Sequence, residues 1–281
     1  MQVVRTRADL RAALAAAPRP VGLVPTMGWL HAGHLSLVER ARAESATVVV
    51  SIFVNPRQFG QAVDFTQYPR NEARDLAMCE AAGVDLVFAP TVDEVYPPGF
   101  DTVVSVGAIG GPLEGAARPG HFDGVATVVA ILFALVGAER AYFGLKDYQQ
   151  VRVIRRMALD LALPTEVVAL ETVRDPDGLA MSSRNARLSP AGRSAAPVLR
   201  RALLAGGARV RSGERDAGAV RAAMLAELAT EPMADVDYVS VADPETLEEL
   251  ATISNGALLS LAVGIEGVRL IDNEQVVPGS R

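Results

Sequence analysis

The chain has 281 residues, of which half are hydrophobic and 21% are charged, as expected for a globular protein of one large or two moderate domains. The formal net charge of −6 argues against a nucleic-acid-binding surface, which needs a basic face. A single cysteine, Cys79, rules out an intramolecular disulfide and suits a reducing cytoplasm. We expect no signal peptide, because Arg and Asp follow the first residues before any apolar run develops. We expect no membrane partner, because the most apolar stretch (125–137) is shorter than the ~20 residues of a membrane-spanning helix.

Strand and helix patterns alternate through the first part of the chain. We expect strands at 21–25, 47–54, 84–89, 141–143 and 166–173, and helices at 35–45, 71–82, 122–136 and 148–161. This alternation predicts an α/β fold, a Rossmann-like parallel sheet with helices on both faces. Ligands of such sheets bind at the carboxyl ends of the strands, near a topological switch point.

The pattern changes near residues 171–174, where we place a hinge. The sequence DPDG at 175–178 is typical of a turn. Helices are expected at 190–204 and 217–230, and strands at 236–241, 257–263 and 268–271. The sequence therefore predicts a larger domain over residues 1–172 and a smaller C-terminal α+β domain over residues 173–281.

The turn that follows the strand expected at 21–25 has the sequence MGWLHAGH over residues 27–34. Neither a G-x-G-x-x-G sequence nor a P-loop is found, but two of the three histidines, His31 and His34, lie in this turn. His34 opens the next helix, where unpaired amides and the helix dipole favour an anion. This favours a phosphate site. Zinc bound by these histidines and His121 is rejected, because no H-E-x-x-H or C-x-x-C pattern supports it.

Two later motifs contain further candidates for binding phosphate. Lys146 is the only lysine in the chain and follows a predicted strand; an ordinary surface lysine is the alternative. Lysine presents a compact ammonium, whereas arginine presents a planar fork. Because every other basic residue of the chain is arginine, the single lysine at this position favours a specific role. The sequence MSSR at 181–184 combines hydroxyls with Arg184, which suits a phosphate, although a helix cap beside a surface charge explains it equally well.

Together these motifs resemble the nucleotidyltransferase superfamily, in which an H-x-G-H turn and a later M-S-S-R or K-M-S-K-S-like loop bind the phosphates of ATP. More closely, the chain is similar to the pantothenate synthetase (pantoate–β-alanine ligase) family over about residues 21–190. The similarity includes SIFVNPRQFG at 51–60, LEG at 113–115, RPGHF at 118–122, KDYQQ at 146–150 and residues 177–185. In combination these segments are highly specific.

The resemblance implies a set of site residues. The ATP-binding positions would be Met27, Gly28, Trp29, Leu30, His31, Ala32, Gly33, His34, Gly144, Leu145, Lys146, Asp147, Val173, Met181, Ser182, Ser183 and Arg184. Gln58 and Gln150 would bind pantoate, and Gln58 would also face β-alanine. His34 is the position assigned as proton donor, and His31, Lys146 and Arg184 would help neutralise phosphate charge.

The resemblance also implies an activity. The enzyme would use ATP and Mg²⁺ to adenylate pantoate, then join it to β-alanine, supplying a precursor of coenzyme A. It would be a cytoplasmic homodimer whose smaller domain closes over the ATP site, and a loop at 61–68 would shield the adenylate from water.

Three positions depart from the family pattern, and a fourth matches a position that binds metal in some members. Trp29 and Ala32 replace a small residue and a glutamate, and Leu145 replaces a glutamate. Asp75 matches a position that helps to bind magnesium in some members. Its neighbours Arg74 and Met78 are not ligand-like, so magnesium would arrive on the phosphates instead.

Two other functions fit part of this motif set. An adenylyltransferase of the same fold that ends at the adenylated product would not need Gln58 and Gln150 together. A non-catalytic ATP sensor would not need both histidines, the lone lysine and the glutamines.

Overall fold

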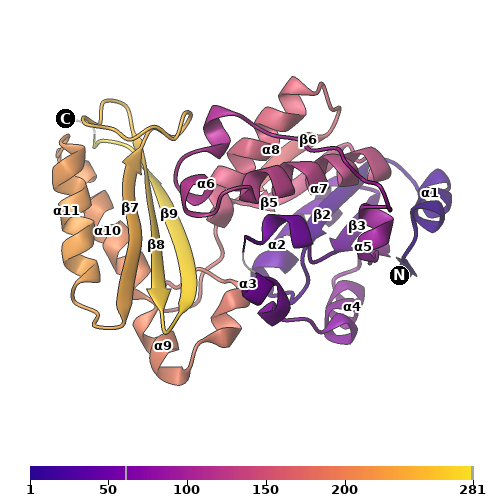
Figure 1. Ribbon diagram of the computed structural model, residues 1–281, viewed down its shortest axis with the longest axis horizontal. Helices are drawn as coiled ribbons and strands as arrows, with labels where there is room; N and C mark the ends of the chain where they lie inside the picture. The colour runs from indigo at the N-terminus through magenta and orange to yellow at the C-terminus, as the bar shows by residue number, and fades with distance from the viewer. Residues whose placement is uncertain (61, 280–281) are drawn as a thin grey trace. The chain divides into compact units, whose positions relative to one another are not determined.

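The computed structural model describes residues 1–60 and 62–279, with the backbone alone for residues 62–64. The chain forms two compact units (Figure 1). The larger unit comprises Met1–Leu145 and Gln149–Glu171, and the smaller comprises Lys146–Tyr148 and Thr172–Arg281. The short segment Lys146–Tyr148 therefore belongs with the smaller unit, although both of its flanking segments belong to the larger one.

A six-stranded parallel sheet organises the larger unit, which confirms the predicted Rossmann-like α/β class. Its strands are β1 (Gln2–Val4), β2 (Val21–Thr26), β3 (Thr47–Ile52), β4 (Leu86–Phe88), β5 (Arg140–Gly144) and β6 (Glu166–Leu170). Their order is β1-β4-β3-β2-β5-β6. The sheet grows outward from β2 in one direction through β3 and β4 and in the other through β5 and β6. The switch point, where ligands of such sheets bind, thus lies between β2 and β5.

Helices connect these strands and cover both faces of the sheet (Figure 1). They are α1 (Arg7–Ala15), α2 (Ala32–Glu44), α3 (Ala62–Gln67), α4 (Glu72–Ala81), α5 (Val92–Val95), α6 (Glu114–Ala117), α7 (His121–Val136) and α8 (Tyr148–Asp160). Short 3₁₀ turns are η1 (Pro56–Gln58), η2 (Ala108–Gly110) and η3 (Leu145–Asp147). The sequence patterns had not predicted β1 or α1. The segment 61–68, expected to be a loop, is helical over α3, and Gln61 lies outside the described residues.

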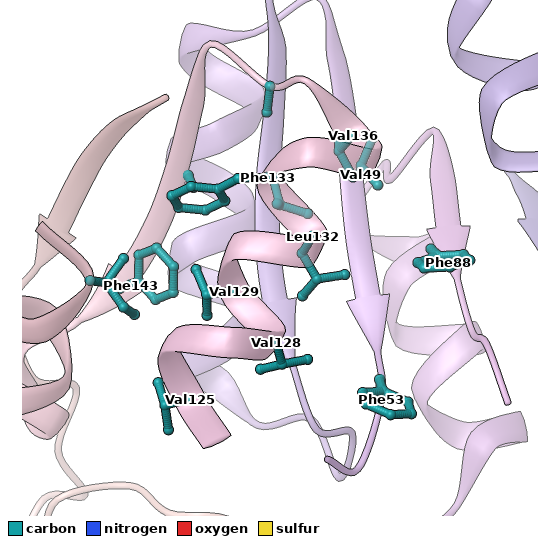
Figure 2. Close-up of a cluster of buried hydrophobic side chains, with 14 of the residues drawn as sticks. Val49, Phe53, Phe88, Val125, Val128, Val129, Leu132, Phe133, Val136 and Phe143 are labelled. Atoms are coloured by element: carbon teal, nitrogen blue, oxygen red, sulfur yellow. The ribbon is translucent and has the colours of Figure 1, made fainter. Parts of the chain in front are cut away.

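Two apolar layers form the core of the larger unit, one on each face of the sheet. Alternate strand residues enter opposite layers, as Leu23 and Val24 do. One layer contains most of α7, whose side chains meet those of the strands (Figure 2). Val125, Val128 and Val129 are buried in this layer. Among the described residues, no helix has the length and apolar character needed to cross a membrane.

The smaller unit is a three-stranded antiparallel sheet packed against helices. Its elements are η4 (Ser183–Arg187), α9 (Pro190–Ala195), α10 (Val198–Arg211), α11 (Ala217–Leu228), β7 (Ala234–Ala242), β8 (Ala257–Ile265) and β9 (Val268–Val276). The single helix expected at 190–204 is wrong: α9 ends before Pro197, whose missing N–H and fixed φ favour a break there. Glu266 and Gly267 both have positive φ in the two-residue turn that joins β8 to β9.

Cys79 is completely buried on α4 within one apolar layer. Burial, and secondarily the negative charge of Asp75, raise the pKa of its thiol to about 11. The thiolate, which is the reactive form, is therefore suppressed at neutral pH. This agrees with its interpretation as a small core residue.

We predict that the folded protein resists a disulfide-exchange reagent at pH 8, and that one equivalent reacts after unfolding in guanidinium. The release of the reagent's chromophore measures both states. A Cys79→Ser variant, which should give no signal in either state, is the control. Fast labelling of the folded wild type would show that the thiol is accessible.

Candidate functional site

The turn between β2 and α2 occupies the carboxyl edge of the sheet at the switch point. Gly28 has φ +79°, and a Cβ there would lie 2.9 Å from Oδ2 of Asp75, so only glycine fits. Trp29 follows with φ +51°, which is a strained conformation for a bulky residue. The backbone therefore takes two successive left-handed residues as it leaves the strand.

The two histidines of this turn cap α2 reciprocally. His31 is the N-cap residue, and its Nδ1 accepts the N–H of Gly33 at 3.1 Å. The N–H of His31 in turn donates to Nδ1 of His34 at 3.3 Å. The rings lie 4.1 Å apart between centroids. Because both Nδ1 atoms are acceptors, each neutral imidazole has its proton on Nε2, where it can be donated to a ligand oxygen.

A carboxylate and a guanidinium from α4 contact the same turn. Asp75 accepts the N–H of Trp29 at 2.7 Å and that of Leu30 at 2.8 Å, one on each oxygen. Arg74 donates to the carbonyl of Leu30 at 2.9 Å, and its guanidinium lies over the Trp29 ring. Asp75 is only 1% exposed. The conformation of the turn thus depends on the first turn of a different helix.

Gln58, predicted to bind pantoate, lies at the end of η1 and is buried. Its Oε1 accepts from Nδ2 of Asn55 at 3.0 Å, and its Nε2 lies 3.0 Å from Sδ of Met27, a weak acceptor. Asn55 is itself held by the hydroxyl of Tyr96, which donates to its Oδ1 at 2.8 Å. The Gln58 side chain and the Met27 turn therefore belong to one local site.

The start of α7 supports Gln58 from the other side. Gly124 packs against η1, where a Cβ would lie 2.3 Å from the carbonyl oxygen of Arg57. Nδ1 of His121 donates to the carbonyl of Gln58 at 2.8 Å, and Arg118 donates to the same oxygen at 3.2 Å. His121 thus holds the backbone of η1, a role that the sequence patterns had not predicted.

Gln150, the second predicted pantoate residue, lies in the first turn of α8 and is partly buried. Its neighbour Gln149 has a structural role, because its Oε1 accepts the N–H of Glu114 and its Nε2 donates to the carbonyls of Ile109 and Pro112. Gln149 therefore holds the chain that leads into α6, and only Gln150 of the pair remains a candidate for substrate binding.

Lys146 lies in the smaller unit, in a small hollow that it lines together with Ser182, Arg184, Asn185 and Asp272. The lysine side chain is 16% exposed, and its ammonium is 3.4 Å from a carboxylate oxygen of Asp147. Oδ1 of Asn185 is buried without a hydrogen bond in the described part of the chain. Two cations and a hydroxyl therefore line this hollow, which suits a phosphate group, whereas Oδ1 of Asn185 would accept only from a donor group of a ligand.

The remaining predicted residues of this unit are fixed by a hairpin. The N–H of Met181 donates to the carbonyl of Val173 at 3.0 Å, and Gly178 closes the predicted turn with φ +91°. At its base, Arg174 makes a bidentate pair with buried Asp272 at 2.6 and 2.9 Å. The hairpin therefore places Val173 beside Met181, immediately before the Ser182–Arg184 residues.

A magnesium site on Asp75 does not fit the geometry. Both carboxylate oxygens accept backbone N–H groups, and a guanidinium nitrogen of Arg74 lies 3.4 Å away. In the described part of the chain, no three His, Cys, Asp or Glu side chains cluster as metal ligands. Asp75 therefore serves the turn, and the sequence could not reveal this because the contact spans more than 40 residues.

Comparison with known proteins gives a consistent result over nearly the whole chain. A family model described as pantoate-beta-alanine ligase matches residues 2–275. A pantothenate synthetase of Roseiflexus sp. (strain RS-1) is 62% identical over 273 residues, covering 97% of this chain and 98% of the relative. One from Moorella thermoacetica is 50% identical over 276 residues, covering 97% and 98%.

Solved structures agree in fold. A pantothenate synthetase from Thermus thermophilus has a TM-score of 0.94 at 52% identity, covering 99% of this chain and all of that one. A pantoate-beta-alanine ligase from Francisella tularensis, crystallised with beta-gamma ATP and beta-alanine, has a TM-score of 0.81 at 31% identity, covering 98% and 97%.

We predict that the three histidines divide by tautomer. At a pH where all are neutral, His31 and His34 should be protonated on Nε2, whereas His121, which donates from Nδ1 to a carbonyl, should be protonated on Nδ1. Long-range ¹H–¹⁵N correlation spectra distinguish the two forms, and His→Gln variants assign the signals. Three identical tautomers would contradict the capping arrangement.

Proposed function

Because this chain belongs to the pantoate-β-alanine ligase family, we propose that it catalyses the ATP-dependent condensation of (R)-pantoate with β-alanine to pantothenate. The observation that carries the proposal is the contact between the amide of Gln58 and Met27 of the H-x-G-H turn. It joins the proposed acyl-binding residue to the proposed nucleotide-binding turn, as a reaction between a carboxylate and the α-phosphate requires.

In the proposed first step, a carboxylate oxygen of pantoate attacks the α-phosphorus of ATP. The bond from that phosphorus to the bridging oxygen breaks, and pyrophosphate leaves. In the second step the neutral amine of β-alanine attacks the acyl carbon, the bond to the phosphate oxygen breaks, and AMP leaves while the nitrogen loses a proton. Gln58 and Gln150 suit pantoate, because an amide can both donate to its carboxylate and accept from its hydroxyls.

The histidines supply donors to the nucleotide in this proposal. With Nδ1 of each ring engaged by the backbone, the Nε2–H groups of His31 and His34 are fixed in direction by the helix cap. A donor held in advance toward developing negative charge stabilises the transition state more than a mobile one. We assign the proton-donor role to His34 and ground-state binding together with capping to His31.

The remaining ATP contacts are assigned to residues 144–147, Val173 and Met181–Arg184. Lys146 and Arg184 would neutralise the phosphates as pyrophosphate forms, and Ser182 would donate a hydroxyl. We further propose that the smaller domain, 173–281 by sequence, closes over the bound ATP. Magnesium is assigned as part of the substrate, bound to the phosphates of ATP, because Asp75 is already engaged by the backbone.

The proposed setting is a cytoplasmic homodimer that makes a precursor of coenzyme A. The family resemblance and the single, buried cysteine support it. Sedimentation velocity gives the mass in solution, and a species of one chain across micromolar concentrations would contradict the dimer.

We predict that steady AMP formation from Mg-ATP requires both pantoate and β-alanine, with pantothenate formed in equal amount. Mass spectrometry of a complete mixture and of mixtures lacking one component measures this. Pantoate alone should give at most one equivalent of pyrophosphate per site. Multiple turnovers without β-alanine would indicate an adenylyltransferase or a hydrolase, and binding of ATP without any pyrophosphate release would indicate a sensor.

We predict that Lys146→Arg lowers kcat/KM by about 10²-fold although it keeps the charge. The lysine side chain is mostly enclosed beside Asp147, and a planar guanidinium is wider with donors fixed in a plane. Steady-state kinetics compare it with wild type and Lys146→Ala. Arg201→Lys, at an exposed ion pair with Glu227, is the control for the exchange itself and should be unchanged. If Lys146→Arg keeps most of the activity, Lys146 contributes only its positive charge and the prediction is wrong.

A further inference from the structure

We propose that Arg74 and Asp75 are positioning residues that hold residues 28–30 in the ATP-binding conformation, and that Asp75 binds no metal ion. The proposal rests on the assignment of the 27–34 turn to ATP. It concerns how a helix separate in sequence fixes that turn, which the chemical roles of the histidines leave unexplained.

The contacts converge on two consecutive residues. Asp75 accepts the N–H groups of Trp29 and Leu30 at 2.7 and 2.8 Å, and Arg74 donates to the carbonyl of Leu30 at 2.9 Å. Its guanidinium carbon also lies 5.2 Å from the centre of the Trp29 ring. Hydrogen bonds from backbone amides to a carboxylate are among the stronger kinds in proteins. Three backbone groups and one side chain of the turn are therefore held by two adjacent residues.

The turn needs this support because its backbone is strained. Trp29 has φ +51°, which a residue with a Cβ rarely adopts, and Gly28 leaves no room for a side chain against Asp75. Such a conformation persists only where the surroundings hold it. The carboxylate supplies that restraint, since its two oxygens face adjacent amides at once.

The same arrangement opposes a metal. Each oxygen of Asp75 accepts one backbone N–H and keeps a second lone pair, but the side chain is buried and the guanidinium of Arg74 lies 3.4 Å from Oδ1, so a magnesium ion here would be placed beside a positive charge in a site closed to water. Met78, one turn further along α4, offers only a thioether, a poor ligand for a hard cation. The carboxylate is thus committed to the backbone.

The consequence for catalysis follows from the position of the histidines. His31, the N-cap residue of α2, directly follows Leu30, so a displacement of Leu30 moves the cap and both imidazoles. A shift of about 1 Å in a reacting geometry can lower a rate by about 10²-fold. Asp75 therefore acts through the turn and needs no contact with the nucleotide.

The first measurement uses the ligand-free enzyme without metal. Asp75→Asn keeps the shape but faces one N–H with an amide NH₂ group, so exchange of the Trp29 and Leu30 amide hydrogens should accelerate by about ten- to a hundredfold. Glu72→Gln is the matched control, because it removes one exposed acidic charge from the same helical turn. It should leave both amides unchanged. Unchanged exchange in Asp75→Asn would overturn the proposal, whatever the enzyme's substrates.

The second measurement separates positioning from metal binding and from loss of folded protein. In Asp75→Asn we expect the KM for ATP to rise and kcat/KM for ATP to fall by about 10²-fold, with the KM for β-alanine and the Mg²⁺ concentration for half-activation unchanged. A tenfold rise in that Mg²⁺ concentration would overturn the proposal in favour of a metal ligand. A fall in kcat alone, with every KM unchanged, would overturn it in favour of simple instability.

A third measurement tests the strain directly. Glycine adopts positive φ without strain, so on a Trp29→Gly background the effect of Asp75→Asn on kcat/KM should be about tenfold smaller than in wild type. An equal effect on both backgrounds would overturn the link to strain. Where Asp75→Asn does not fold, as judged by circular dichroism, Arg74→Ala replaces it in all three measurements with the same expected directions, and unchanged exchange at Leu30 again overturns the proposal.

Discussion

The pairing of β2 with β5 is the contact on which the arrangement of the larger unit depends. Gly22 pairs with Arg140 and Leu23 with Ala141, which joins two strands separated by more than 100 residues. On one side of this pair the chain builds outward through β3 and β4, and on the other through β6. Parallel strands end at the same edge, so the turn at 27–34 and Gly144 leave the sheet side by side. Everything proposed about the nucleotide in this unit starts from that adjacency.

The same edge leaves backbone amides without sheet partners, and side chains of the site supply most of the missing acceptors. Nδ1 of His31 accepts from Gly33, Nδ1 of His34 accepts from His31, and Asp75 accepts from Trp29 and Leu30. The two histidine acceptors have a consequence beyond stability, because accepting at Nδ1 determines which ring nitrogen carries the proton. A proton added to either Nδ1 would break the cap as well as change the charge of the site. The Nδ1 atoms of His31 and His34 therefore determine both the helix cap and the protonation of the rings.

The sequence predicted what depends on local pattern and on short motifs. The alternation of strands and helices gave the α/β class correctly. The helix predicted at 71–82, between Asn71 and Gly83, agrees with α4 (Glu72–Ala81) to within two residues at each end. Contacts between distant residues were beyond it. Nothing local distinguishes Asp75 as an acceptor for Trp29, or Tyr96 as the support of Asn55, and α9 was merged with α10 because alanine-rich periodicity outweighed Pro197. The site residues themselves stay predictions, whose local settings the structure describes.

The residues proposed for acyl binding and those proposed for phosphate binding are held within different units of the chain. Gln58, which we propose to bind pantoate, is held through its side chain, its backbone carbonyl and the close packing of η1 against Gly124. Lys146 and Arg184, which we propose to neutralise the phosphates, belong to the smaller unit. There Asn273 of β9 donates to the carbonyl of Lys146 at 2.9 Å, and Gln275 donates to the hydroxyl of Tyr148 at 2.8 Å. These bonds hold the lysine in the unit that contains Arg184, although β5, which precedes it in the chain, belongs to the larger unit. The proposed phosphate-binding cations therefore belong to one unit, and Gln58 belongs to the other.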